Sequence, residues 1–199
     1  MINHVCHLTF RPSDEQHLVL KQECSVLADG DFEVSMVAVG ALVGHREDIH
    51  LYNVAFPKSR WLRGRKLLKA IQQKSREIDA GIYHLHDPAL LGIGKKLKKD
   101  GKIVVYSSHR DEPLARIKKH WLPKFLRKIP AGRIARKENR VFYLFDGLVA
   151  SSTALKKRFL AFHSAVVEVS DDPKTWESES KKLLVLYRKL VTRERYGYS

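Results

Sequence analysis

Short apolar runs alternate with stretches of helical periodicity from one end of the chain to the other. A brief run of β-branched and apolar residues is typical of a buried strand, whereas apolar residues three and four apart are typical of an amphipathic helix. Strands are expected at residues 4–9, 33–39, 50–54, 82–86, 102–107, 147–150 and 165–169. Helices are expected at residues 14–28, 60–76, 88–99, 131–145, 153–161 and 175–191. This alternation predicts an α/β fold: a single Rossmann-like domain whose mostly parallel sheet carries helices on both faces.

The size of the chain favours one domain. A length of 199 residues is enough for one α/β domain with a full core and too short for two. Near the end, Asp171-Asp172-Pro173 interrupts the pattern, and proline is favoured in the first turn of a helix. We therefore expect one domain over residues 1–170 and a terminal helix with a tail over residues 171–199.

The net charge of the chain favours polyanionic partners but does not identify one. The formal net charge is +15, and such a surface attracts nucleic acid, anionic lipid headgroups or phosphorylated substrates. No apolar run approaches the roughly 20 residues that a membrane-spanning helix needs, so no membrane-spanning helix is expected. The first residues lack the basic segment and apolar core of a secretory signal, which predicts a cytoplasmic protein. Cys6 and Cys24 lack metal-ligand spacing and are expected to be free, packed thiols.

Polar and titratable residues follow three of the expected strands. They lie in the segments 9–14, 84–88 and 107–113. In a doubly wound sheet the ligand lies outside the carboxyl ends of the strands, where the connecting loops converge. A functional site is therefore expected at this edge of the sheet.

One of these segments resembles a known family. Residues 82–91 read IYHLHDPALL and resemble the HxHDPxLL strand-to-helix segment of family 4 glycosyltransferases, which are GT-B enzymes. Further similar pieces follow the family's order: HLT at 7–9, KQEC at 21–24, VVY at 104–106 and FDGLVA at 145–150. Together they cover about residues 1–165, the amino-terminal half of such an enzyme. The resemblance implies that this domain is half of a GT-B fold whose loops face a sugar acceptor.

The resemblance also implies site residues. It places His109 at the family's active-site histidine beside the transferred sugar, which makes it the catalytic candidate. The acceptor-binding candidates are Arg11, Asp14, His86, Asp87, Arg110 and Asp111. Two pieces depart from the family: residues 107–111 read SSHRD where the family has DVHED, and residues 14–19 lack the arginine of its DxRIF acceptor loop. Asp87 has an equally good structural interpretation as the N-cap of the helix that Pro88 opens.

The end of the chain also resembles the family, but the part of the enzyme that should come before this end is missing. Residues 176–187 are similar to its terminal WExExxxLxxLY helix, which implies that residues 171–199 pack back on the domain. A GT-B enzyme has a second Rossmann-like domain before that helix, whose helix dipole, basic side chains and paired glutamates bind the nucleotide sugar. That domain is missing between residues 169 and 176. Glu15 and Glu23 have the spacing of the paired glutamates, but they lie in the wrong domain, so we treat the match as chance.

We expect no metal and no cofactor. No histidine pairs with a carboxylate at helical ligand spacing. Gly92-Ile93-Gly94 lacks a third glycine at Leu97 and lies inside an expected helix, so it is not a dinucleotide fingerprint.

The segment 116–140 is rich in lysine and arginine, with apolar residues between them. It is typical of a surface that meets anionic lipid while its apolar side chains enter the interface, although a solvated basic helix face fits equally well. The candidate membrane patch consists of Lys118, Lys119, Trp121, Lys124, Phe125, Arg127 and Lys128. No zinc spacing, helix-turn-helix or RNA-binding signature supports nucleic acid as the partner.

Three hypotheses follow. The first is an acceptor-side domain from cell-surface polysaccharide or glycolipid synthesis, unable to transfer sugar alone, with a lipid-linked or saccharide acceptor at the inner face of the membrane. The second is a split enzyme completed by a separate donor-domain chain, which exposed apolar surface around Trp176, Leu183 and Tyr187 would favour. The third is a basic module that binds anionic lipid or nucleic acid, which steep salt dependence would indicate.

Overall fold

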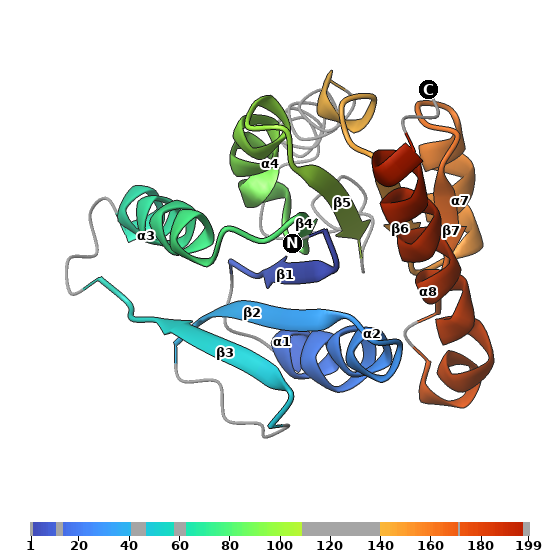
Figure 1. Cartoon of the computed structure of the whole chain (residues 1–199), viewed down its shortest axis with the longest axis horizontal. Helices are drawn as coiled ribbons and strands as arrows, with labels where there is room; N and C mark the ends of the chain where they lie inside the picture. Colours follow the sequence, from blue (N-terminus) through green and yellow to red (C-terminus); the bar gives the residue numbers. More distant parts are fainter. Residues whose placement is uncertain are drawn as a thin grey trace, which may run out of the picture.

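The computed structural model describes residues 2–10, 14–40, 47–57, 63–108, 140–170 and 172–196. The elements in chain order are β1 (His4–Leu8), α1 (Asp14–Leu18), η1 (Val19–Cys24), α2 (Ser25–Asp29), β2 (Glu33–Val39), β3 (Ile49–Val54), α3 (Arg63–Ile78), β4 (Ile82–Leu85), η2 (Pro88–Leu90), α4 (Leu91–Lys99), β5 (Ile103–Ser108), β6 (Gly147–Ala150), α7 (Thr153–Leu160), β7 (Val166–Glu168) and α8 (Pro173–Tyr196) (Figure 1). All seven expected strands are confirmed within a residue or two at each end. Residues 131–139 of the helix expected at 131–145 lie outside the described residues, and of the rest residues 140–142 are helical.

Within the described part of the chain, the seven strands form one sheet in the order β3-β2-β1-β4-β5-β6-β7, and every neighbouring pair is parallel. The strands β4, β5 and β6 are buried along their whole length. Strands covered on both faces carry continuous apolar runs instead of an alternating pattern, which is what the sequence has here. The predicted α/β class is confirmed.

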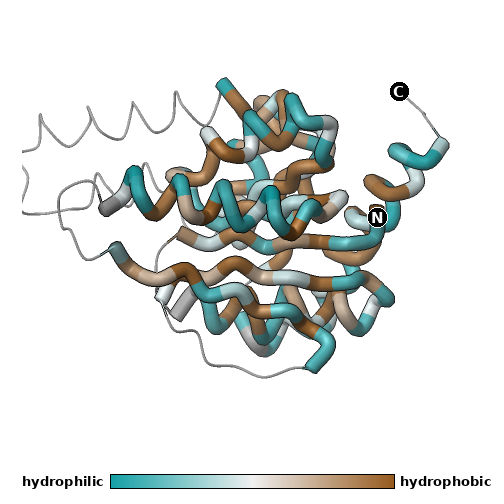
Figure 2. The backbone as a smooth tube through the Cα atoms, turned by 60° about the vertical axis from the view of Figure 1, so that its left-hand side comes forward, coloured by the Kyte–Doolittle hydropathy of each residue, from teal (hydrophilic) through white to brown (hydrophobic). Residues whose placement is uncertain are grey.

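Each face of the sheet has its own core. Residues next to one another on a strand point to opposite faces, so Val5 belongs to one apolar cluster and Cys6 to the other. Helices α3, α4 and α7 supply side chains to the cluster that contains Cys6, and η1, α2 and α8 supply the cluster that contains Val5. Figure 2 shows polar and apolar residues alternating along the helices, as expected for helices with one buried side.

The terminal helix α8 covers half of one face. Its buried residues Leu183, Leu186, Tyr187, Leu190 and Val191 recur at the three- and four-residue spacing of one helix side, and none is more than 8% exposed. They share a cluster with residues of β4, β5 and β6, and α8 also contacts η1, α2 and β7. Without α8, this half of the sheet would present its apolar side chains to water.

Among the helices that the structure describes, none combines the length and the apolar character needed to span a bilayer.

Candidate functional site

The candidate site lies between β1 and β4, at the topological switch point of the parallel sheet, where the strand order reverses. The chain that follows β1 enters η1 on one face of the sheet, whereas the chain that follows β4 enters α4 on the other. Connections that leave neighbouring strands toward opposite faces create a crevice at the carboxyl ends, which is the usual ligand position in such folds. The backbone N–H of His86 donates to the carbonyl of Leu8 at 3.1 Å, so the two strands stay paired up to this edge.

Three histidines gather at this point on the face that η1 covers. His84 and His86 are two residues apart and therefore point to the same side, and His7 is paired with His84 across the strands. Their ring centroids are 5.0 Å apart for His7 and His84, 5.2 Å for His7 and His86, and 4.3 Å for His84 and His86. The parallel register thus places His7 beside His84, which lies far from it in the sequence.

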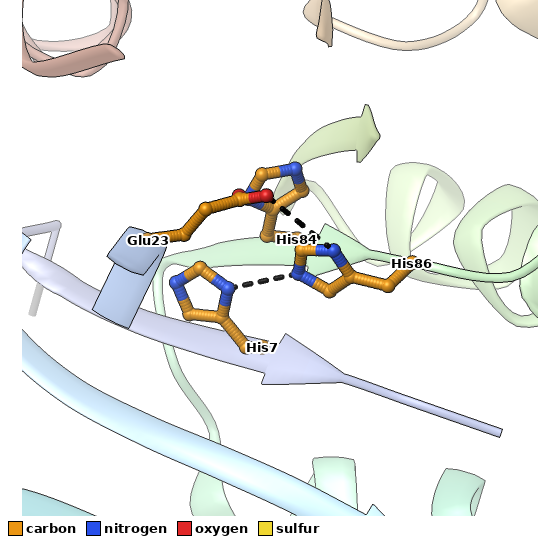
Figure 3. A group of neighbouring side chains, drawn as sticks. All are labelled: His7, Glu23, His84 and His86. Carbon is orange, nitrogen blue, oxygen red and sulfur yellow. Dashed lines mark hydrogen bonds and ion pairs between the residues drawn. The ribbon is translucent and has the colours of Figure 1, made fainter. Parts of the chain in front are cut away.

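A carboxylate completes the cluster from above the sheet. Glu23 lies in η1, a stretch of π-helix in the middle of what the sequence predicts as one continuous α-helix. Its Oε2 is 3.2 Å from His84 Nδ1, and its Oε1 is 3.9 Å from His86 Nδ1. Figure 3 shows Glu23 beside the His84 and His86 rings and His7 directed at His86. Short π-helical segments are rare and occur frequently at functional sites.

The cluster is shielded from water. His7 and His84 are fully buried, Glu23 is 3% exposed, and the His86 side chain is 3% exposed. Burial disfavours the charged imidazolium and lowers the pKa of His7 to about 3, so this ring is neutral at neutral pH. His7 Nδ1 and His86 Nε2 are hydrogen-bonded at 2.9 Å, with one nitrogen donating and the other accepting. His7 Nε2 is buried and has no hydrogen-bond partner among the described residues.

The terminal helix reaches the same cluster. The Tyr187 hydroxyl of α8 is hydrogen-bonded to His84 Nδ1 at 2.8 Å, and burial together with the nearby Glu23 charge raises the pKa of this phenol well above its usual range. A chain of polar contacts therefore runs from β1 through β4 and η1 to α8. Three imidazoles and one carboxylate are groups that relay protons or hold a metal ion.

The structure describes two of the acceptor candidates completely. His86 lies inside the buried cluster. Asp87 is 7% exposed, and its Oδ1 accepts a hydrogen bond from the Ala89 backbone N–H at 2.7 Å. Asp87 therefore caps η2, as its structural interpretation predicts. The acceptor roles of both residues stay predictions.

The remaining candidates lie outside what the structure describes. They are His109, Arg11, Arg110, Asp111, the side chain of Asp14, and the membrane patch of Lys118, Lys119, Trp121, Lys124, Phe125, Arg127 and Lys128. Their predicted roles stay predictions.

The cluster as a unit was not predicted from the sequence. Metal ligands were expected at helical spacing within one element, whereas His7, Glu23, His84 and His86 come from β1, η1 and the end of β4. The available signal was the alternation of His84 and His86 on one strand face, together with a histidine on the expected first strand. Strand order was the missing information.

Comparison with known proteins identifies the architecture. No protein-family model matches the chain, and no curated protein sequence matches it. A structure of sucrose-phosphate synthase from Thermosynechococcus elongatus is similar with a TM-score of 0.64 at 12% identity, over 94% of this chain and 98% of that chain. The structure of LpCGTa in complex with UDP is similar with a TM-score of 0.54 at 10% identity, over 85% of this chain and 54% of that chain. The domain has the fold of one half of a GT-B glycosyltransferase. At these identities the similarity concerns the GT-B half-fold alone, and this chain spans about half the length of LpCGTa.

Proposed function

We propose that this chain is the acceptor-side domain of a family 4 type glycosyltransferase from cell-surface polysaccharide or glycolipid synthesis, and that it does not transfer sugar by itself. The observation that carries the proposal is the connection between β7 and α8. Only residues 169–172 separate Glu168 from Pro173. In the family that the sequence resembles, the domain that binds the nucleotide sugar precedes the terminal helix. Four residues leave no space for such a domain.

The packing of α8 supports this interpretation. The helix packs on the apolar face over β4, β5 and β6, and its Tyr187 is hydrogen-bonded to His84, as expected for a terminal helix that returns to the acceptor-side domain.

The split-enzyme alternative is not supported by the surface of the terminal helix. Exposed apolar surface around Trp176, Leu183 and Tyr187 would favour that alternative. Leu183 and Tyr187 are fully buried, and Trp176 packs against the same core. The terminal helix is therefore already engaged with its own domain, and a donor-domain partner chain would need another surface.

We further propose that the chain works at the inner, cytoplasmic face of an anionic membrane, where a lipid-linked acceptor would be presented. The net charge of +15 and the basic, apolar segment 116–140 support this. Contacts between basic side chains and anionic lipid weaken as salt screens them.

Calorimetric titration of the chain with a panel of nucleotide sugars, followed by a radiolabel transfer assay with saccharide and lipid-linked acceptors, tests the proposal. We expect no donor binding and no transfer. Donor binding with transfer would overturn it, since it would require a donor site within these 199 residues.

Liposome flotation tests the membrane part separately. We expect flotation with anionic vesicles that high salt abolishes and that K124Q/K128Q weakens. The control variant K95Q/K99Q removes the same charge from exposed positions of α4 and should float like the parent chain. Equal loss in both variants would show a general charge effect and contradict a defined patch.

A further inference from the structure

Three histidines and one glutamate lie together at the topological switch point of the sheet. Each of these four residues offers one nitrogen or oxygen atom, and these atoms all lie within 4.8 Å of one another. We propose that His7, Glu23, His84 and His86 together bind one divalent transition-metal ion of the zinc class. This inference goes beyond the glycosyltransferase proposal and stands independently of it.

The distances suit a tetrahedral site. Zinc binds histidine nitrogen and carboxylate oxygen at about 2.0–2.1 Å, so the ligand atoms of a tetrahedral site lie about 3.3 Å from one another. One ligand atom from each of the four residues can be chosen so that all four lie within 4.8 Å of one another. The widest pair must close by about 1.5 Å or less to reach it. Small rotamer changes cover such a shift without moving the strands.

The ligand types select the metal. Imidazole favours zinc, copper, iron and nickel, whereas magnesium and calcium are held mainly by oxygen ligands. Burial adds a second indication. His7 is fully buried, and its Nε2 has no hydrogen-bond partner among the described residues. Buried polar atoms in native proteins are almost always satisfied, so such an atom indicates that something normally binds nearby.

The geometry also indicates what the metal would do. Four protein ligands fill a tetrahedral shell and leave no position for water or substrate, which is the composition of a structural site and not of a catalytic one. Glu23 belongs to η1, His7 to β1, and His84 to β4. The ion would therefore clamp η1 onto the two strands at the switch point. The Tyr187 hydroxyl on His84 extends this clamp to α8 as an outer-shell contact.

The first test measures binding. The shielded ligands predict slow exchange, so the metal-free protein is prepared by unfolding in chelator and refolding, with and without Zn²⁺ or Co²⁺. We expect one metal per chain, a higher melting temperature with metal, and a Co²⁺ absorption spectrum typical of tetrahedral nitrogen and oxygen ligands without a thiolate band. A refolded chain that binds neither ion would overturn the proposal.

The second test locates the ion. Glu23→Gln and His86→Gln keep the approximate size of each side chain and remove the ligand atom, and each should weaken Zn²⁺ affinity by at least tenfold. His50→Gln, on an exposed position of β3, is the matched control and should bind like the parent chain. Unchanged affinity in both cluster variants would place the ion elsewhere and refute the site.

If a cluster variant fails to fold, X-ray absorption spectroscopy of the zinc-loaded parent chain identifies the ligand atoms of the ion directly. Three imidazole ligands without sulfur support the site. Fewer than three imidazoles, or any thiolate ligand from Cys6 or Cys24, would overturn it, because neither thiol belongs to the proposed ligand set.

Discussion

The close packing of α4 on the sheet rests on a missing side chain at Gly94. A Cβ atom built there would lie 2.5 Å from Leu85 Cδ1 and 2.8 Å from Phe145 Cζ, distances that real Cβ atoms essentially never show. Gly92, two residues earlier in the same helix, offers a matched control because a Cβ there meets nothing within 4 Å. Gly94 is buried and Gly92 is exposed. The pair therefore separates steric fit from helix propensity.

The expected magnitudes follow from two opposing effects. Overpacking a well-packed core costs about 1–3 kcal/mol. Alanine is favoured over glycine in a helix interior by about 0.8–1.0 kcal/mol. Gly94→Ala should therefore destabilise the protein by about 0–2 kcal/mol net, whereas Gly92→Ala should stabilise it by up to about 1 kcal/mol. The difference between the two variants, about 1–3 kcal/mol, depends only weakly on the propensity because most of it cancels.

Urea unfolding followed by circular dichroism measures the difference, with melting curves as a second readout. For a protein of this size, 1 kcal/mol shifts the melting temperature by about 2–4 °C, so Gly94→Ala should melt about 4–8 °C below Gly92→Ala for a central difference of about 2 kcal/mol. The denaturant slope should be unchanged, because the fold and its buried surface are the same. Equal stability of the two variants would refute the steric argument and show that Leu85 and Phe145 move aside at no cost.

Three further predictions test the cluster and its surroundings. Tyr187→Phe removes the hydroxyl on His84 and should cost about 1 kcal/mol of unfolding free energy, whereas Tyr143→Phe, at a residue that is 66% exposed, should be neutral in the same urea titration. Asp87→Ala removes the cap of η2 and should cost about 0.5–2 kcal/mol, and Asp87→Asn should recover most of it; equal loss in both would point to a role for the negative charge. In chelator, the pKa of His7 is about 3 in the folded chain and about 6.5 in the unfolded chain, so the unfolded chain binds a proton first as the pH falls. The contribution of His7 to the free energy of unfolding is therefore complete above about pH 6.5, and it falls by up to about 1.4 kcal/mol per pH unit as the pH drops from there toward 3. Melting curves of His7→Gln across this range should show a flatter pH dependence, and an unaltered slope would contradict a buried neutral His7.

The pattern of the sequence was sufficient for the elements and the fold class. Strands buried on both faces must be continuously apolar, and helices covering them must be apolar on one side, so both signals are local and visible without any tertiary information. The structural role of Asp87 was equally local, since a cap depends only on the residues that follow it. The same local pattern failed inside the first helix, where the π-helical turn of η1 replaces continuous α-helix. Propensity does not distinguish the two.

The cluster and the position of α8 were decided by tertiary structure alone. His7 and His84 face each other because β1 pairs with β4, and strand order is a property of the whole sheet that no window of sequence contains. Glu23 joins them because η1 crosses the same face, and Tyr187 arrives from a helix 103 residues further along the chain than His84. Periodicity says which side of an element is buried, and it therefore predicted that residues such as Leu183 face a core. Which core they face depends on the area left uncovered by every other element, and only the folded chain determines that.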